Sequence, residues 1–313
     1  MSFILTQVQQ DLSVVILVKL LIAGLCFGGH TLLYKSEFVW LKSKQGVVFL
    51  VLTTIFAWYD MASYVIGWVY AGRSNGPAGL IGSLVFVSVI VAFFGGRYFF
   101  NETQKRIQYI GWGITLTALI LITLNNNMTD SNSSDNEIDS YYISVSIGLF
   151  LTNGIDLGLY TLTLKYASKH HNIIEGELVV LSRGIGSLIL VIGAILYGAD
   201  YTQIYPAALV TNNFWICISG SLQYIGWCFL GKAINLGKAQ LTQLFGGAYP
   251  FAQILWEVIV LGKYPTLTQS ALIMFLIIGA AMVILNEEKD DPHSNETTHL
   301  LTSEEMKDIP GKL

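Results

Sequence analysis

The feature of this sequence that most constrains its fold is a series of apolar segments, each close to the length that crosses a lipid bilayer. A membrane-spanning helix needs about 20 mainly apolar residues. Only 12% of the 313 residues are charged and 53% are hydrophobic, whereas soluble domains carry about 25% charged residues. We therefore predict an all-α integral membrane protein whose spanning helices, nine in number, lie at 12–34, 46–70, 78–99, 107–125, 143–165, 177–198, 213–232, 239–261 and 267–286.

The distribution of Lys and Arg predicts how these helices are oriented, because cytosolic loops are enriched in basic residues. Alternate loops and their flanks hold Lys35, Lys42, Lys44, Arg97, Lys105, Arg106, Lys165, Lys169, Lys232 and Lys238. The opposite loops hold only Arg73 and Lys263. The first set is therefore expected in the cytosol together with the C-terminal tail, and the N-terminus is expected in a lumen or outside the cell.

The acidic loop 126–142 agrees with this orientation. It carries two glycosylation sequons, at Asn127 and Asn132, and the predicted topology places it in the lumen, where glycosylation occurs. Together with the helices it divides the chain into a first repeat of four helices (1–125), the luminal loop, a second repeat of five helices (143–286) and a disordered cytosolic tail (287–313).

An internal repeat relates the two halves of the chain. Gly76-Pro77-Ala78 aligns with Gly237-Lys238-Ala239, which lies 161 positions later, and the same shift aligns Gln108 with Gln269. This register moves each helix along by five places in the series of spans. Because five is odd, the two repeats are predicted to have opposite orientations, as in carriers that alternate access around a midplane site.

The segment from Gly76 through Glu102, followed by Gln108 and Gly111, resembles the repeat signature of the drug/metabolite transporter superfamily (EamA-like). The second copy runs from Gly237 through Pro250 to Gln269, so the resemblance covers about 12–286. It implies ten helices as five plus five, and the export or exchange of small metabolites.

Three features depart from this pattern. The usual Glu of the second copy is Lys263, and the usual Gly of the first copy is Asn101. The first helix of the first repeat is not evident, so either the chain has nine helices or its start is missing. The loss of that helix would remove part of one cavity wall.

Charged side chains within the predicted helices are the main candidates for a functional site, because a charge inside a bilayer costs about 2.5–3.5 kcal/mol or more. We expect substrate-binding side chains among Lys19, Asp60, Asn153, Asp156 and Arg183. Proton coupling is expected at Asp60, Asp156 or Glu257, if burial from water lets one of them take up a proton. The alternative is that these charges form ion pairs that only fix the packing of helices.

A second attractive segment is Gln240–Pro250, where two glycines and a proline loosen a helix. Backbone carbonyls freed in this way are tolerated at membrane depth only beside a cavity or a neighbouring group. Gln243 and Tyr249 are the candidate substrate contacts there, and a kink needed for packing is the alternative.

Other classes of protein are disfavoured. The sequence has no catalytic triad, phosphate loop or metal-binding motif in a supporting context, so we expect no enzyme activity, no cofactor and no metal site. A basic stripe of the kind that binds nucleic acid is also missing. The expected partners are the lipid bilayer and a small-molecule substrate.

The tail contains an acidic dileucine pattern formed by Glu296, Leu300 and Leu301. In a flexible cytosolic peptide this spacing offers an acid to a basic patch and two leucines to an apolar pocket, as a clathrin adaptor requires. We therefore expect a late endosomal, lysosomal or vacuolar membrane, with the plasma membrane and Golgi as alternatives.

The leading hypothesis is a secondary transporter for a small polar metabolite, an amino acid-like compound or another zwitterion or anion. The rival is a non-transporting scaffold or receptor that retains the carrier fold, since fold does not fix function.

Overall fold

All regular elements in the described part of the chain are helices, as the sequence predicted. The computed structural model describes residues 24–30, 38–73, 81–102, 105–128, 140–196, 221–222, 224–231, 233–234 and 266–285.

Most helix boundaries lie within three residues of the predicted ones where both can be compared, but the helix predicted at 143–165 continues to His171. The elements are η1 (Val39–Lys42), α3 (Lys44–Arg73), η2 (Ser83–Phe86), α5 (Val87–Phe100), α6 (Arg106–Met128), α7 (Ser140–His171), α8 (Glu175–Leu196) and α12 (Leu267–Leu285). Residues 24–30 and most of 221–234 are also helical. The predicted helix 239–261 lies outside the described residues, so the nine-helix count stays a prediction.

Three of these helices are long and apolar enough to cross a membrane: Lys44–Trp68, Tyr141–His171 and Glu175–Gly193. Their outward-facing side chains are apolar, as Val48 is 61% exposed, Ile192 55% and Ile155 44%. Polar and charged side chains such as Asn153 and Arg183 are fully buried instead. A surface of apolar side chains around buried polar side chains is favourable in lipid and unfavourable in water.

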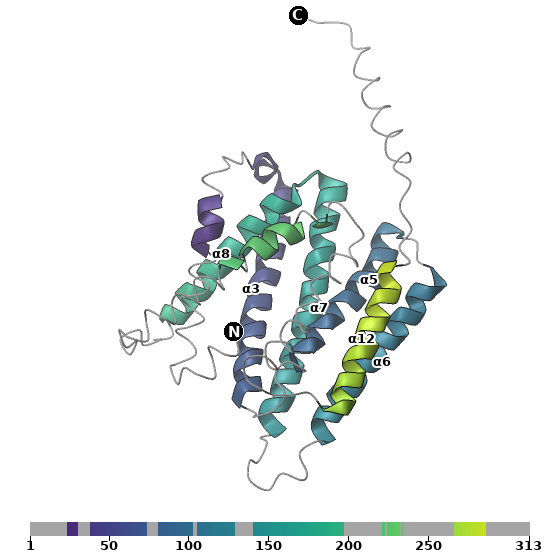
Figure 1. Cartoon of the computed structure of the whole chain (residues 1–313). Helices are drawn as coiled ribbons and strands as arrows, with labels where there is room; N and C mark the ends of the chain where they lie inside the picture. The colour runs from purple at the N-terminus through teal and green to yellow at the C-terminus, as the bar shows by residue number, and fades with distance from the viewer. Residues whose placement is uncertain are drawn as a thin grey trace, which may run out of the picture.

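The helices form a bundle with α7 at its centre. Helix α7 contacts α3 and α8 on one side and α5 with η2 on the other, while α6 and α12 pack against each other (Figure 1). One apolar core, including Trp68, Phe93 and Phe150, joins α3, α5 and α7 to the α6–α12 pair. A second core, including Tyr160 and Leu178, joins α3, α7 and α8.

Basic residues gather at one end of the bundle, where α5 and α7 end. Lys165 Nζ lies 2.7 Å from Glu102 Oε1. Lys165 and Lys169 both lie near the Phe100 ring, with their Nζ atoms 5.5 Å and 5.7 Å from its centroid. These are residues that the sequence assigned to the cytosolic side, so the predicted cytosolic ends of α5 and α7 are adjacent.

Helix α5 is followed by Asn101 as its C-terminal cap. Asn101 adopts the left-handed conformation (φ 54°, ψ 33°), and its backbone N–H donates to the Gly96 carbonyl. The Glu102 N–H donates to the same carbonyl at 3.3 Å. Glycine is the usual residue at such a helix end and asparagine is the best-tolerated substitute. Asn101 therefore supports the same local geometry that glycine would.

We expect Asn101→Val to lower the free energy of unfolding by about 1–2 kcal/mol, because a β-branched residue is disfavoured in the left-handed region. Asn101→Gly is the matched control and should leave stability unchanged or higher. The thermal midpoint of the purified full-length protein in detergent measures both. Equal midpoints for the two variants would contradict this account of the helix end.

Helices α6 and α12 run antiparallel and approach closely. The Gln108 side-chain amide, near the start of α6, donates to the Val283 carbonyl near the end of α12 at 3.1 Å. A Cβ added at Gly111 would lie 2.7 Å from the Gly279 carbonyl oxygen, and one added at Gly279 would lie 2.7 Å from that of Gly111. The two glycines thus let the backbones touch. The repeat predicted from the sequence also relates these two helices and expects them to have opposite directions; the repeat itself stays a prediction.

Candidate functional site

Asp60 lies in the middle of α3 and faces the interior, with only 7% of its surface exposed. One carboxylate oxygen, Oδ2, pairs with Nη1 of Arg183 on α8. The other, Oδ1, accepts a hydrogen bond of 3.0 Å from Nδ2 of Asn153 on α7. Both oxygens of Asp60 are therefore engaged, and three helices meet at this carboxylate.

Arg183 is completely buried, so neighbouring side chains rather than water must stabilise its positive charge. Besides the bond to Asp60, two aromatic rings lie against its guanidinium group. The distance from Cζ to the ring centroid is 4.6 Å for Tyr160 and 3.3 Å for Trp227. Cation–π contacts of this kind stabilise a desolvated guanidinium. The Tyr160 hydroxyl is held by the Ser182 hydroxyl at 3.0 Å, which fixes that ring beside α8.

Asn153 holds α7 to α3 through its side-chain NH₂ group. Besides Asp60 Oδ1, this group donates to the Asp60 backbone carbonyl at 2.8 Å and to Ser63 Oγ at 3.0 Å. The Ser63 hydroxyl itself donates to the Tyr59 carbonyl at 2.7 Å, so it acts as an acceptor for Asn153. The Asn153 oxygen, Oδ1, lies on the other side of the amide and has no hydrogen-bond partner among the described residues.

Asp156 lies one helical turn after Asn153, so both side chains lie on the same face of α7. It is 7% exposed and close enough to Asp60 and Arg183 to interact with their charges. Its Oδ2 atom is buried without a hydrogen-bond partner in the described part of the chain. The cluster thus contains two acids and one base, and the carboxylate that lacks a direct partner is that of Asp156.

We call these four residues, Asp60, Asn153, Asp156 and Arg183, the buried charged cluster. Its members were proposed from the sequence one by one, and the structure brings them together. Chemically the cluster offers a carboxylate and an amide oxygen as acceptors and a guanidinium group as donor. Such a set can hold a proton or a small charged solute.

The remaining predicted site residues lie outside the described residues, and their roles stay predictions. These are Lys19, Gln243, Tyr249 and Glu257 for substrate or protons, Glu296, Leu300 and Leu301 for sorting, and Asn132 for glycosylation. Asn127 lies in the last turn of α6, because that helix continues to Met128 rather than ending at residue 125. The following helix, α7, begins at Ser140, so the connecting segment is shorter than predicted.

Sequence reasoning missed the neighbours that complete the cluster. Ser63 follows Asp60 by three residues and Tyr160 follows Asp156 by four, so helical spacing alone could have placed both on the right face. Trp227 gives no such signal, because it is far from the cluster in the sequence and one of several tryptophans in apolar segments.

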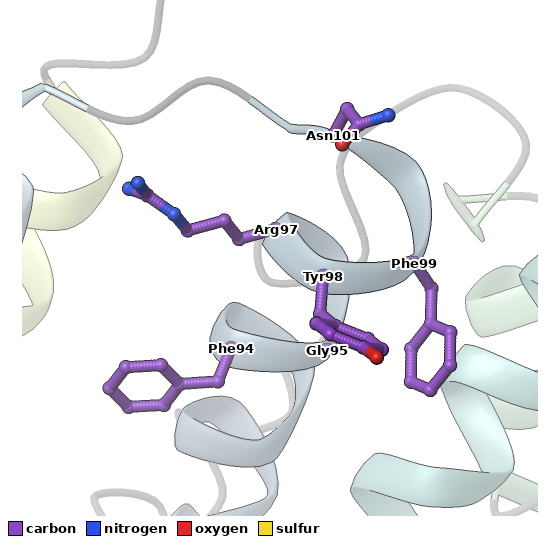
Figure 2. A pocket seen from close by; sticks show the side chains of 6 residues that line it. All are labelled: Phe94, Gly95, Arg97, Tyr98, Phe99 and Asn101. Atoms are coloured by element: carbon purple, nitrogen blue, oxygen red, sulfur yellow. The ribbon is translucent and has the colours of Figure 1, made fainter.

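A separate surface pocket lies at the C-terminal end of α5. It has a volume of about 740 Å³ and is lined by Phe94, Gly95, Arg97, Tyr98, Phe99 and Asn101. Figure 2 shows the aromatic side chains and Arg97 projecting from the last turns of this helix. Exposed aromatic residues beside a basic residue are typical of the headgroup level of a membrane. The pocket shares no lining residue with the buried charged cluster.

No family model matches this chain, and no curated protein matches it. Among solved structures, 23 chains are similar to it. One solved structure, described only as the crystal structure of a protein, covers 88% of this chain and 89% of its own with a TM-score of 0.60 and 12% sequence identity. At that identity the similarity concerns the fold alone, so this chain shares its helical fold with a protein of solved structure.

Proposed function

We propose that this chain is a secondary transporter resembling the drug/metabolite transporter superfamily, which moves a small polar metabolite across an endolysosomal or vacuolar membrane. The metabolite is amino acid-like or another zwitterion or anion. The observation that carries the proposal is the buried charged cluster, which three helices assemble inside an apolar bundle.

Burying charged groups away from water is expensive, and the partners that would offset it are incomplete here. A cluster that served packing alone would be expected to satisfy each polar atom, yet Asp156 Oδ2 and Asn153 Oδ1 have no hydrogen-bond partner in the described residues. Unsatisfied buried polar groups are rare in native proteins and each calls for an explanation, and a solute that binds at the cluster is the one we propose here.

Proton coupling would use an acid that is not already held in an ion pair. Asp60 is held by Arg183 and Asn153, so protonating it would weaken an ion pair between helices. Asp156 keeps an oxygen without a hydrogen-bond partner in the described residues, and it can take up a proton without breaking such a pair. Among the three predicted proton carriers we therefore favour Asp156 over Asp60, and Glu257 keeps its predicted role.

The cellular setting of the proposal comes from the sequence. The tail would face the cytosol, where the pattern of Glu296, Leu300 and Leu301 would bind a clathrin adaptor. The N-terminus and the glycosylated segment with Asn127 and Asn132 would face the lumen, and an acidic lumen would supply protons.

A second candidate function is a non-transporting membrane scaffold or receptor. The direct ion pair between Asp60 and Arg183 favours this function, because it links α3 to α8. Asn153 adds a hydrogen bond to the same carboxylate. If the cluster exists only to hold these helices, no small solute should bind it.

A thermal-shift screen of the purified full-length protein against a metabolite library, at pH 5 and at pH 7, tests the proposal. A ligand that binds only the folded state raises the melting temperature in a concentration-dependent way. We expect a chemically related group of hits, each of which is taken up by proteoliposomes that contain the protein. If no compound raises the melting temperature at either pH, the scaffold function replaces the transporter.

A further inference from the structure

The unsatisfied atoms of the buried charged cluster fall into two chemically opposite sets. One set consists of acceptors on α7, Asn153 Oδ1 and Asp156 Oδ2, which lie one turn apart. The other consists of donors on α8, the Nε and Nη2 atoms of Arg183. All four atoms are buried and have no hydrogen-bond partner among the described residues.

The free donors of Arg183 form a defined recognition surface. In a guanidinium group, Nε–H and the adjacent Nη2–H point in parallel along one edge, which matches the two oxygens of a carboxylate. The bond to Asp60 uses the third nitrogen, Nη1, and the Trp227 ring lies close to the group, 3.3 Å from Cζ to the ring centroid. The Nε–Nη2 edge is thus the part of the guanidinium that is left for a ligand.

The free acceptors on α7 have a defined identity as well. Asn153 donates with its NH₂ group to the Asp60 carbonyl, which can only accept, so the opposite atom of the amide must be the oxygen. Beside it, the Asp156 carboxyl group makes no ion pair with any described residue. A carboxylate and an amide oxygen one turn apart suit an ammonium group, which has three donors and no acceptor.

We propose that the cluster binds a zwitterion, with its carboxylate on the Nε–Nη2 edge of Arg183 and its ammonium group on Asp156 and Asn153. The proposal rests on the proposed transport function and narrows its substrate to compounds that carry both charges close together. Asp60 touches no substrate in this arrangement and is a positioning residue that holds Arg183 through Nη1. The two acids, which the sequence could not distinguish, therefore have different roles.

The test compares α-amino acids with partners that lack one charge. Each amino acid of a panel is assayed by thermal shift on the full-length protein, beside its des-amino carboxylic acid and its decarboxylated amine. We expect the amino acids to raise the melting temperature and the single-charge analogues to bind at least about tenfold more weakly. Each analogue leaves either the Arg183 donors or the acceptors on α7 without a hydrogen-bond partner.

Variants separate the two halves of the site. Asp156→Asn should weaken amino-acid binding about tenfold or more while leaving the melting temperature of the ligand-free protein unchanged or higher, since it removes a buried carboxylate that has no direct partner. Arg183→Lys keeps a positive charge for Asp60 but cannot present a planar edge, so it should weaken the binding of the carboxylate end. Tyr59→Phe is the control, because its hydroxyl bonds Thr152 outside the cluster.

The outcomes distinguish the two proposals. If simple carboxylates or simple amines bind and are transported as well as amino acids, the zwitterion site is wrong and the transporter stands. If amino acids bind but Asp156→Asn binds them as the unaltered protein does, the assignment of Asp156 is wrong. If no compound of any class binds, both proposals fail.

Discussion

Arg183→Met is expected to lower the free energy of unfolding by about 3–5 kcal/mol, which is the usual cost of breaking a buried ion pair by removing one partner. The substitution leaves Asp60 as a buried charge with only Asn153 to compensate it. It also removes the contacts of the guanidinium group with Tyr160 and Trp227. The measurement is the unfolding of the full-length protein in detergent micelles, followed by temperature or by added denaturing detergent.

The double variant Asp60→Asn/Arg183→Met provides the control, because it removes both charges. Replacing a whole buried ion pair by neutral groups is often nearly neutral, so the double variant should regain most of the stability lost by Arg183→Met. Together with the single variant Asp60→Asn, these proteins form a thermodynamic cycle that isolates the interaction between the two residues. A double variant as unstable as the single one would show that the pair contributes little and that packing around Arg183 dominates.

Gly158→Leu is expected to destabilise the bundle by about 1–3 kcal/mol through overpacking. Gly158 lies where α7 passes α5, and a Cβ added there would be 2.6 Å from Val91 Cβ and 2.8 Å from the Ser88 carbonyl oxygen. Neither neighbour is the flexible end of a side chain, so the helices would have to separate. Gly154, one turn earlier, meets the Val85 carbonyl oxygen at 2.9 Å in the same way.

Gly148→Leu on the same helix is the matched control. A Cβ at Gly148 would have no neighbouring atom within 4 Å, so leucine there should project from the bundle at little cost. Both variants are compared by thermal midpoint and by the fraction of protein that elutes as a single species. If both glycines accept leucine equally well, the close contact between α5 and α7 does not stabilise the fold.

The sequence predicted much of the secondary structure because a membrane imposes a length and an apolar composition on each helix. The predicted spans 46–70 and 177–198, for example, became α3 (Lys44–Arg73) and α8 (Glu175–Leu196). The ends were less predictable. Asn126, Asn127 and Met128 continue α6 by about one more turn, since polar residues such as the two asparagines do not by themselves end a helix.

The candidate site was predicted as single residues rather than as an arrangement. Asp60, Asp156 and Arg183 attract attention in the sequence because charge is costly in lipid, whatever its partner. Which charges meet depends on how each helix is rotated and which helices are neighbours, and no short-range pattern encodes this. The contact of Trp227 with Arg183 and the Gly158 crossing are of the same kind, since each depends on residues from separate parts of the chain.

The antiparallel pair of α6 and α12 has a consequence for how the protein is made. Chains fold from the N-terminus as they are synthesised, yet the partner of α6 is the most C-terminal of the helices described here. Until residues after 266 leave the ribosome, Gln108 has no Val283 carbonyl to receive its hydrogen bond, and Gly111 lacks the Gly279 backbone against which it packs. Assembly is therefore completed only by a late helix, and a chain whose translation stops before Leu267 would be inserted but unfinished, a natural target for membrane quality control.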